Sequence, residues 1–186
     1  MELSTKRLTA RHIEACDWKS IRDIWKSFNA SGYSCYDKPH PTDDETVRAR
    51  IAKWAEMRDS TEHLFFAVCL NDRVIGYAAF NIRENGYEVG YCFHSDYCRR
   101  GYAKESLSAL LDYLKDLGIT RFTAGTALNN TPSVALLQSL GFRQIGTEKV
   151  SFYQDAHGND IWFDGGIFEL TAAEQQDEER YKTTGR

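Results

Sequence analysis

Short runs of alternating or continuous apolar residues predict β-strands along the 186-residue chain. The turn-forming stretch "NDR" separates two of these runs and "AHGN" separates two others, so each pair is expected to form a hairpin. The predicted strands are residues 4–13, 62–70, 73–82, 86–94, 119–128, 143–155 and 160–170.

Apolar residues spaced three or four positions apart predict helices between these strands. The clearest pattern places Leu107, Leu110, Leu111 and Leu114 on one face of a helix that ends at Gly118. The predicted helices are residues 17–28 (with Asp17 as N-cap), 43–57, 104–118 and 130–142. Residues 29–42, between the first two helices, are rich in turn-forming residues and predict a loop.

The order β-α-α-β-β-β-α-β-α-β-β mixes hairpins with crossovers. This order predicts an α/β (α+β) fold of about seven strands, in which a mixed sheet is covered by helices on both faces. Residues 1–170 are expected to form a single domain, and the charged residues 171–186 a loosely held tail.

Composition narrows the function classes. A net charge of −4 argues against a nucleic-acid-binding protein, which usually carries a basic face. No apolar run reaches membrane-spanning length, and the N-terminus "MELSTKRL" lacks the apolar core of a signal peptide. The five cysteines form no CxxC pair and the five histidines are scattered, so we expect reduced thiols, a cytoplasmic protein and no metal site.

The stretch "YCRRGYAKES", residues 97–106, connects a predicted strand to a predicted helix. The first N–H groups of such a helix, together with its dipole, form a site for phosphate. Gly101 permits a close backbone approach, Ala103 is small, and Arg99 and Arg100 add positive charge. An ordinary solvated basic turn is the alternative interpretation.

Four blocks in order resemble the GNAT acetyltransferase superfamily, within it the branch of the Rim-type ribosomal-protein N-terminal acetyltransferases. The blocks are "TKRLTAR", "YEVGYCFHSDYCRRGYAKES", "NTPSVALLQSLGF" and "GNDIWFDGGIFEL", and the resemblance extends from about residue 3 to 170. It implies a mostly antiparallel, twisted sheet and acetyl-CoA as co-substrate, with no metal. The oligomeric state stays open, with a homodimer as one option because family members are often dimers.

The resemblance also implies which residues bind the pyrophosphate of acetyl-CoA. The family signature Q/R-x-x-G-x-G/A matches Gly101 and Ala103, whereas Cys98 stands where Gln or Arg is expected. Arg99 and Arg100 are expected to supply the missing charge. The cradle would be formed by the backbone N–H groups of residues 99–104, which include Tyr102 and Lys104, and the Tyr102 side chain is expected to pack rather than bind.

Acetyl transfer to an amine requires a base, stabilisation of the carbonyl oxygen and a proton or hydrogen bond for the leaving thiolate. By resemblance, Glu88 is a candidate general base, with a half-solvated strand glutamate as the alternative. The family's strand is splayed by a bulge, so a backbone N–H near Cys92 or Phe93 would face the thioester oxygen and His94 would border the CoA arm. A cysteine nucleophile at Cys92 is a minor alternative to direct transfer.

The sequence shows no obvious general acid that could protonate the leaving thiolate. Many relatives place a tyrosine four residues before the glycine of "GF", and Leu137 occupies that position here. By resemblance, Asn130 would contact the pantetheine arm and Ser133 would act as general acid. Helix capping is the alternative for both residues.

The acceptor would be a small-molecule or peptide amine. Its site is expected among the first two helices, their connecting loop and the last hairpin, where Tyr33, Tyr36, Glu88 and Trp162 are candidate contacts. Acidic residues that could receive a cationic amine are Asp37, Asp43, Asp44 and Glu45. For the last three, a favourable helix start is the preferred interpretation. The sequence therefore predicts an acetyl-CoA-dependent N-acetyltransferase, with a catalytically silent CoA-binding module as the alternative.

Overall fold

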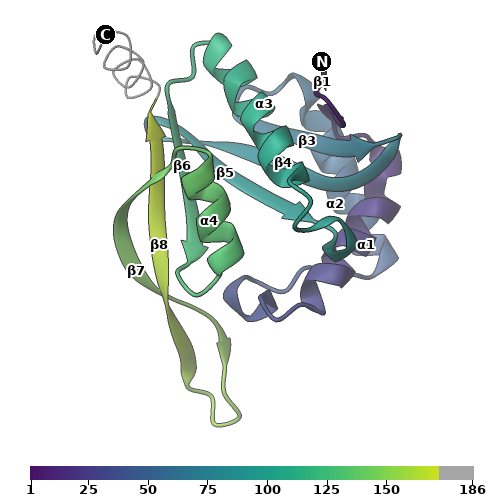
Figure 1. Cartoon of the computed structure of the whole chain (residues 1–186). Helices are drawn as coiled ribbons and strands as arrows, with labels where there is room; N and C mark the ends of the chain where they lie inside the picture. The colour runs from purple at the N-terminus through teal and green to yellow at the C-terminus, as the bar shows by residue number, and fades with distance from the viewer. Residues whose placement is uncertain (172–186) are drawn as a thin grey trace, which may run out of the picture.

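The computed structural model describes residues 1–171, which form a mixed sheet with helices on both faces (Figure 1). Among these residues the strands are β1 Glu2–Ser4, β2 Thr9–His12, β3 His63–Leu70, β4 Arg73–Arg83, β5 Gly86–Phe93, β6 Arg121–Ala127, β7 Arg143–Gln154 and β8 Asp160–Thr171. The helices are α1 Trp18–Asn29, α2 Asp44–Glu56, α3 Tyr102–Asp116 and α4 Thr131–Ser139. The predicted tail lies outside the described residues, except for Thr171, which ends β8.

The described part of the chain forms an eight-stranded sheet with the order β1-β2-β3-β4-β5-β6-β8-β7. Neighbouring strands are antiparallel except for β5 and β6, which are parallel. The fold class and the predicted helices are therefore confirmed, but the count of about seven strands is wrong. The predicted first strand is interrupted by a turn in which the N–H of Thr5 donates to the carbonyl of Leu8 at 2.8 Å, and this turn separates β1 from β2.

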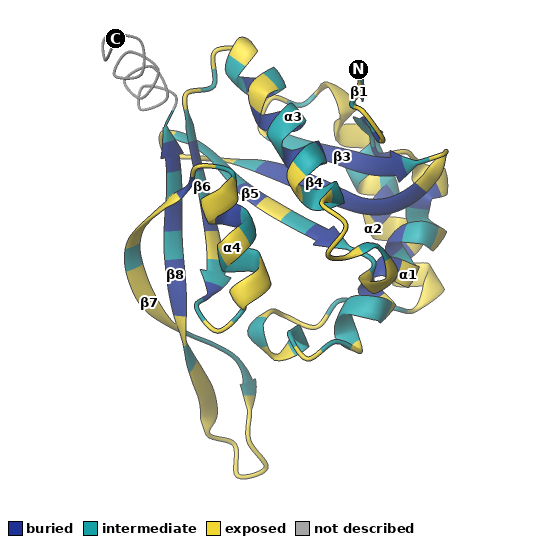
Figure 2. Cartoon of the chain, in the orientation of Figure 1, coloured by how far each residue is buried: buried dark blue, intermediate teal, exposed yellow. Residues whose placement is uncertain are grey.

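Two hydrophobic layers enclose the sheet, so its central strands are buried on both faces (Figure 2). Alternation along β3 directs Phe65 into the layer under α1 and α2, and Phe66 into the layer under α3 and α4. The leucines predicted to line one face of α3 are all at most 2% exposed, which confirms that pattern.

Two acidic residues at helix starts behave differently. The carboxylate of Asp43 accepts the N–H of Thr46 and caps α2, as the acidic start predicts. Asp17 occupies the N-cap position of α1 but makes no capping bond to that helix. Its buried carboxylate instead accepts two hydrogen bonds from Arg11, both at 2.8 Å, and one from the N–H of Glu14. A charged partner therefore outweighs the cap that the sequence suggested.

Candidate active site

The segment between β5 and α3 presents backbone N–H groups at the start of a helix. The first backbone bond of α3 runs from the N–H of Glu105 to the carbonyl of Gly101 at 3.0 Å. The N–H groups of Tyr102, Ala103 and Lys104 therefore precede the intrahelical ladder and are available to an anion. Gly101 has a φ of 78°, a left-handed conformation that glycine adopts without steric cost.

Hydrogen bonds from Thr5 and Arg7 of the N-terminal turn hold this loop in place. Glu105 accepts hydrogen bonds from the Thr5 hydroxyl at 2.6 Å, the Arg7 N–H at 2.8 Å and Arg7 Nε at 2.7 Å. The guanidinium of Arg7 also donates to the carbonyl of Arg100 at 3.0 Å and lies 4.5 Å from the centre of the Tyr102 ring. The Tyr102 side chain thus packs against Arg7. Burial opposes ionisation of Glu105, but these hydrogen bonds outweigh it and lower its pKa.

The loop that carries the arginines is open to solvent. Arg99 and Arg100 are exposed and flank the start of α3. The Cys98 thiol is directed back toward the carbonyl of His94, with the sulfur 3.7 Å from the oxygen. His94 begins the short turn before the loop, and its Nδ1 accepts the N–H of Asp96 at 3.3 Å. Positive charge at this loop therefore comes from Arg99 and Arg100, while Cys98 contributes none.

Strands β5 and β6 diverge soon after they meet. They pair only at Tyr87–Phe122 and Glu88–Thr123, after which β5 continues to Phe93 beside β4 alone. Figure 1 shows the two strands separating toward the loops at their ends. The expected splay is confirmed. The expected bulge is wrong for the β4–β5 pair, because its register runs without a shift from Gly76–Phe93 to Arg83–Gly86.

Side chains from β5 and α4 meet across this gap. The Tyr91 hydroxyl lies 2.8 Å from Ser133 Oγ. Burial raises the pKa of Tyr91 to about 12, so the phenol keeps its proton at neutral pH. Asn130 caps α4 by accepting the N–H of Ser133 at 3.4 Å, which confirms the capping role for Asn130. Leu137 is 1% exposed and belongs to the core, so the place of the family's tyrosine is filled with apolar packing.

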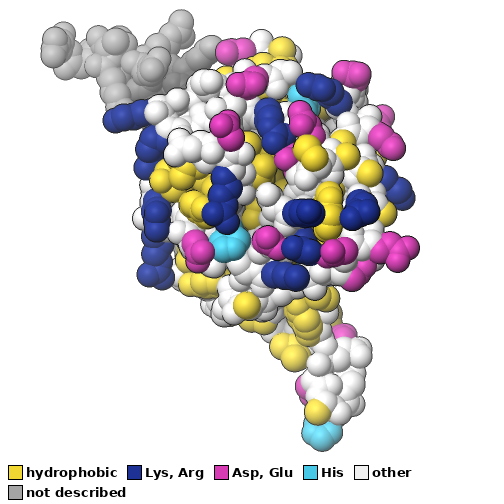
Figure 3. Space-filling view, turned by 90° about the vertical axis from the view of Figure 1, so that its right-hand side faces the viewer, with side chains coloured by type: hydrophobic (Ala, Val, Ile, Leu, Met, Phe, Trp, Pro, Cys, Tyr) yellow, Lys and Arg dark blue, Asp and Glu magenta, His cyan; other side chains and the backbone are white. Residues whose placement is uncertain are grey.

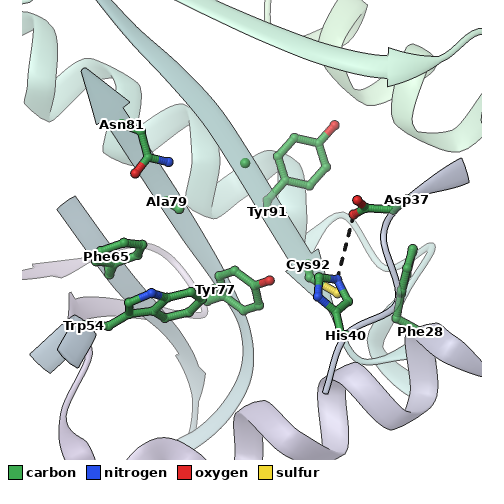
Figure 4. A pocket seen from close by; sticks show the side chains of 11 residues that line it. Phe28, Asp37, His40, Trp54, Phe65, Tyr77, Ala79, Asn81, Tyr91 and Cys92 are labelled. Atoms are coloured by element: carbon green, nitrogen blue, oxygen red, sulfur yellow. Dashed lines mark ion pairs between the residues drawn. The ribbon is translucent and has the colours of Figure 1, made fainter. Parts of the chain in front are cut away.

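A pocket of about 350 Å³ lies on the opposite face of β5, against α1, α2 and their connecting loop (Figure 4). Trp54 stacks on Phe65 with 4.4 Å between ring centres, and Tyr77 packs 5.4 Å from Trp54. Two polar side chains, Asp37 and His40, border the other side of the pocket. The lining residues are Phe28, Asp37, His40, Trp54, Phe65, Tyr77, Ala79, Asn81, Gly90, Tyr91 and Cys92.

This arrangement suits a small cation. Faces of Trp and Tyr rings attract ammonium groups, and a carboxylate at the rim adds the opposite charge. Tyr91 lines the pocket and also contacts Ser133, so it connects the pocket with the gap between β5 and β6. Strand β5 therefore lies between the aromatic pocket and the splay toward β6, where the backbone of β5 beyond Glu88 has no partner among the described strands on that side.

Only one of the residues predicted to contact the acceptor, the acidic residue Asp37, lines the pocket. Asp37 is at its rim, whereas Tyr36 packs on Phe163 with 5.5 Å between ring centres. Tyr33 and Trp162 are also absent from the lining, and Trp162 is 59% exposed on β8. Glu88 points to the same side of the sheet as the pocket but is paired with Arg83 and lies outside the lining.

Cys92 lines the pocket, but burial raises the pKa of its thiol to about 12. A thiol with that pKa is almost entirely protonated at neutral pH and is a poor nucleophile. Its neighbour Phe93 packs into a small cluster with Tyr97 and Tyr102 beside the loop. The buried, protonated Cys92 thiol therefore favours direct transfer over an acyl-cysteine route.

Several residues of the site were not identified from the sequence, among them His40, Tyr91 and Arg7. His40 is separated from other ionisable motifs, Tyr91 is part of a hydrophobic strand, and Arg7 acts through a bond 98 positions away in the sequence. The only sequence signal for Arg7 was its place in the "TKRLTAR" block, and the only signal for Tyr91 was its place in "YEVGY".

Charges on the face formed by α1 and α2 are of both signs. Figure 3 shows Lys and Arg interspersed with Asp and Glu there, rather than a continuous basic surface. Across residues 1–171, no helix combines the length and apolar character that a membrane span requires. In the same residues no group of His, Cys, Asp and Glu side chains is arranged to hold a metal ion.

Comparison with known proteins agrees with this architecture. Residues 7–143 match the model of the acetyltransferase (GNAT) domain. The uncharacterized N-acetyltransferase YnaD of Bacillus subtilis is 30% identical over 168 residues, which cover 87% of this chain and 92% of YnaD.

Solved structures share the fold. A GNAT-family acetyltransferase from Bacillus anthracis aligns with a TM-score of 0.72 at 26% identity, over 92% of this chain and 98% of that one. RimL, a ribosomal L7/L12 alpha-N-protein acetyltransferase solved in complex with coenzyme A, aligns with a TM-score of 0.78 at 17% identity. That alignment covers 92% of this chain and 98% of RimL.

Proposed function

The chain belongs to the GNAT acetyltransferase family, and from that premise we propose that it transfers acetyl directly from acetyl-CoA to a primary amine. The observation that carries this proposal is that β5 lies between the aromatic pocket and the splay toward β6, where its backbone groups beyond Glu88 have no partner strand on that side within residues 1–171. Acetyl-CoA would occupy the gap, and the amine would enter from the pocket. The acceptor would be a protein N-terminus, a polyamine, an amino acid or an amine antibiotic.

The loop at the start of α3 would hold the pyrophosphate. Its N–H groups are at a helix N-terminus, where the helix dipole favours an anion. Arg99 and Arg100 would add charge, and Arg7 would keep the loop in position through Arg100 and Glu105. Asn130 would contact the pantetheine arm through its amide nitrogen, because its oxygen is used in capping α4.

The pair formed by Tyr91 and Ser133 would stabilise the departing sulfur. Either hydroxyl can donate across the 2.8 Å between them; in the proposed arrangement the Tyr91 hydroxyl would donate to Ser133 Oγ and leave the Ser133 proton free to point at the sulfur. The neutral amine nitrogen forms a bond to the acetyl carbon, the carbon–sulfur bond breaks, and the nitrogen loses one of its protons to solvent to give the amide. CoA leaves as a thiolate that takes up a proton from solvent. Backbone N–H groups of β5 that face the gap, near Cys92 and Phe93, would stabilise the carbonyl oxygen.

The test has two steps. CoA at one hundred times its Kd should stabilise the protein by about 2.7 kcal/mol, which corresponds to a rise in Tm of roughly 5–10 °C for a chain of this size. Thiol release from acetyl-CoA should then depend on added amine. Suitable probes are an alanyl tripeptide, spermidine, free amino acids and an aminoglycoside.

A second function, a silent CoA-binding module, is favoured by the buried Leu137 and by Cys98 in the anion loop. A rise in Tm without amine-dependent thiol release across the panel would support that function. The absence of any stabilisation by millimolar CoA would contradict both.

A further inference from the structure

The loop between α1 and α2 brings a histidine and an aspartate to the rim of the aromatic pocket. His40 Nε2 lies 3.8 Å from Asp37 Oδ2, as the dashed line in Figure 4 shows. The loop is tied to α1 because the Asn29 side chain donates to the carbonyl of His40 at 2.9 Å and accepts its N–H at 3.4 Å. The His40 backbone is therefore fixed beside the pocket by hydrogen bonds as well as by packing.

Aromatic rings hold the imidazole in one orientation. His40 stacks on Trp25 with 5.2 Å between ring centres and 12° between planes, and the Phe28 ring packs edge-on at 5.4 Å. Trp25 is itself fixed by its indole N–H, which donates to the Tyr77 hydroxyl at 3.0 Å. A ring clamped in this way is positioned before any substrate arrives.

Burial keeps the His40 imidazole neutral at pH 7. Burial lowers the pKa of His40 below its ordinary value of 6.5, Asp37 opposes this shift, and Arg50 of α2 adds to it. From the sheet, Tyr77 and Cys92 face the same pocket, and burial raises the pKa of both, so neither is charged there at neutral pH. Trp25 and Phe28 of α1 carry no ionisable group. His40 is therefore a neutral imidazole that can accept a proton, with the Asp37 carboxylate beside it.

We propose that His40, supported by Asp37, is the general base that removes a proton from the acceptor's ammonium group. This inference rests on the proposed acetyl transfer. An N–H bond of the ammonium breaks, the proton moves to the neutral imidazole, and the nitrogen lone pair becomes free to attack the acetyl carbon. The imidazolium that forms lies 3.8 Å from the Asp37 carboxylate, which stabilises its charge. After the attack the nitrogen loses its second proton to solvent, and His40 returns its own proton to solvent once CoA departs.

Glu88 is less suited to this role. It is paired with Arg83, which occupies its carboxylate, and its side chain is 41% exposed. His40 lines the pocket directly. The two candidates can be separated because only the substitution that removes the true base should change the pH dependence of kcat/KM.

The experiment compares the wild type with His40→Gln, Asp37→Asn and Glu88→Gln, with His12→Gln as a matched control. His12 is also a partly buried histidine whose pKa is lowered by burial, but it packs on Phe66 away from the pocket. We would measure kcat/KM for the best amine of the panel between pH 5.5 and pH 9, together with CoA affinity and Tm. His40→Asn serves as a second variant if His40→Gln lowers Tm more than the control does.

His40→Gln should reduce kcat/KM by about 10²–10⁴-fold near pH 6.5, with unchanged CoA affinity. The deficit should shrink as pH rises toward the pKa of the amine, because free amine then needs no base. Asp37→Asn should cause a smaller loss and move the acid limb to lower pH, since it removes the group that raises the pKa of His40. Glu88→Gln and His12→Gln should stay within about threefold of the wild type.

The proposal is overturned if the pH profile of His40→Gln matches that of His12→Gln, or if Glu88→Gln shows the pH-dependent loss instead. In either case the wild type still transfers acetyl, so the proposed function stands. A wild type that binds CoA but acetylates no amine of the panel overturns the proposed function, and this inference with it.

Discussion

Gly101 and Gly118 offer a matched pair of positions for testing the anion loop. They flank the two ends of α3 and both have left-handed backbones, with φ of 78° and 89°. An alanine at such a position costs about 1–2 kcal/mol, or roughly 2–8 °C in Tm for a chain of this size. A Cβ at Gly118 would meet nothing within 4 Å, and one at Gly101 would meet only the flexible end of Arg7 at 3.4 Å. The two substitutions should therefore cost similar stability.

Binding of CoA should separate the two variants. Gly101→Ala should strain the loop whose N–H groups face the pyrophosphate, and the loss of one hydrogen bond to a charged group costs about 1.5–3 kcal/mol. The Kd for CoA, measured by isothermal titration calorimetry, should rise about 10–100-fold. Gly118→Ala should leave it unchanged. Equal CoA affinity in the two variants, at equal loss of Tm, would refute the assignment of this loop as the pyrophosphate site.

Three further variants test other parts of the site. Arg99→Ala combined with Arg100→Ala should weaken CoA binding several-fold at low salt and less at high salt, because both side chains are exposed and salt screens their charge. The Tm should stay within about 2 °C of the wild type. A loss of affinity that does not depend on salt would contradict a role of these two charges in CoA binding. Leu137→Tyr should lower the stability by about 1–3 kcal/mol without raising turnover, because the residue is 1% exposed and has no room for a phenol; an active, equally stable variant would contradict this. Cys92→Ala should keep most of the turnover, because the pKa of about 12 keeps the Cys92 thiol protonated in the wild type. Intact-protein mass spectrometry of the wild type with acetyl-CoA alone should find no acetyl-enzyme. An acetylated Cys92 would contradict direct transfer.

The fold could be predicted from the sequence to the extent that hydrophobic periodicity determines it. The leucines of α3 and the buried runs of β3 and β4 gave correct elements because their burial follows directly from their pattern. The turn at Thr5 was missed because its hydrogen bonds to Leu8 and Glu105 are not visible in an alternating pattern. Asp17 was misassigned as a cap for the same reason, since Arg11 competes for its carboxylate.

The two halves of the site differ in how far they could be predicted. The pyrophosphate loop is contiguous in sequence, so its glycine, its arginines and the helix that follows could be identified together. The aromatic pocket combines α1, α2, the loop between them and three strands. The positions of His40 and Tyr91 in that pocket depend on packing across the sheet, which single-residue patterns do not encode. Glu88 was selected by position on a strand, and its pairing with Arg83 became visible only in the fold.

A crystal structure of the CoA complex would show directly whether β5 separates a CoA site from an amine site. This separation predicts the pyrophosphate within hydrogen-bonding distance of the N–H groups of residues 99–104 and the thiol between β5 and β6, beside Tyr91 and Ser133. CoA bound elsewhere, or a thiol that lies away from this gap, would contradict it.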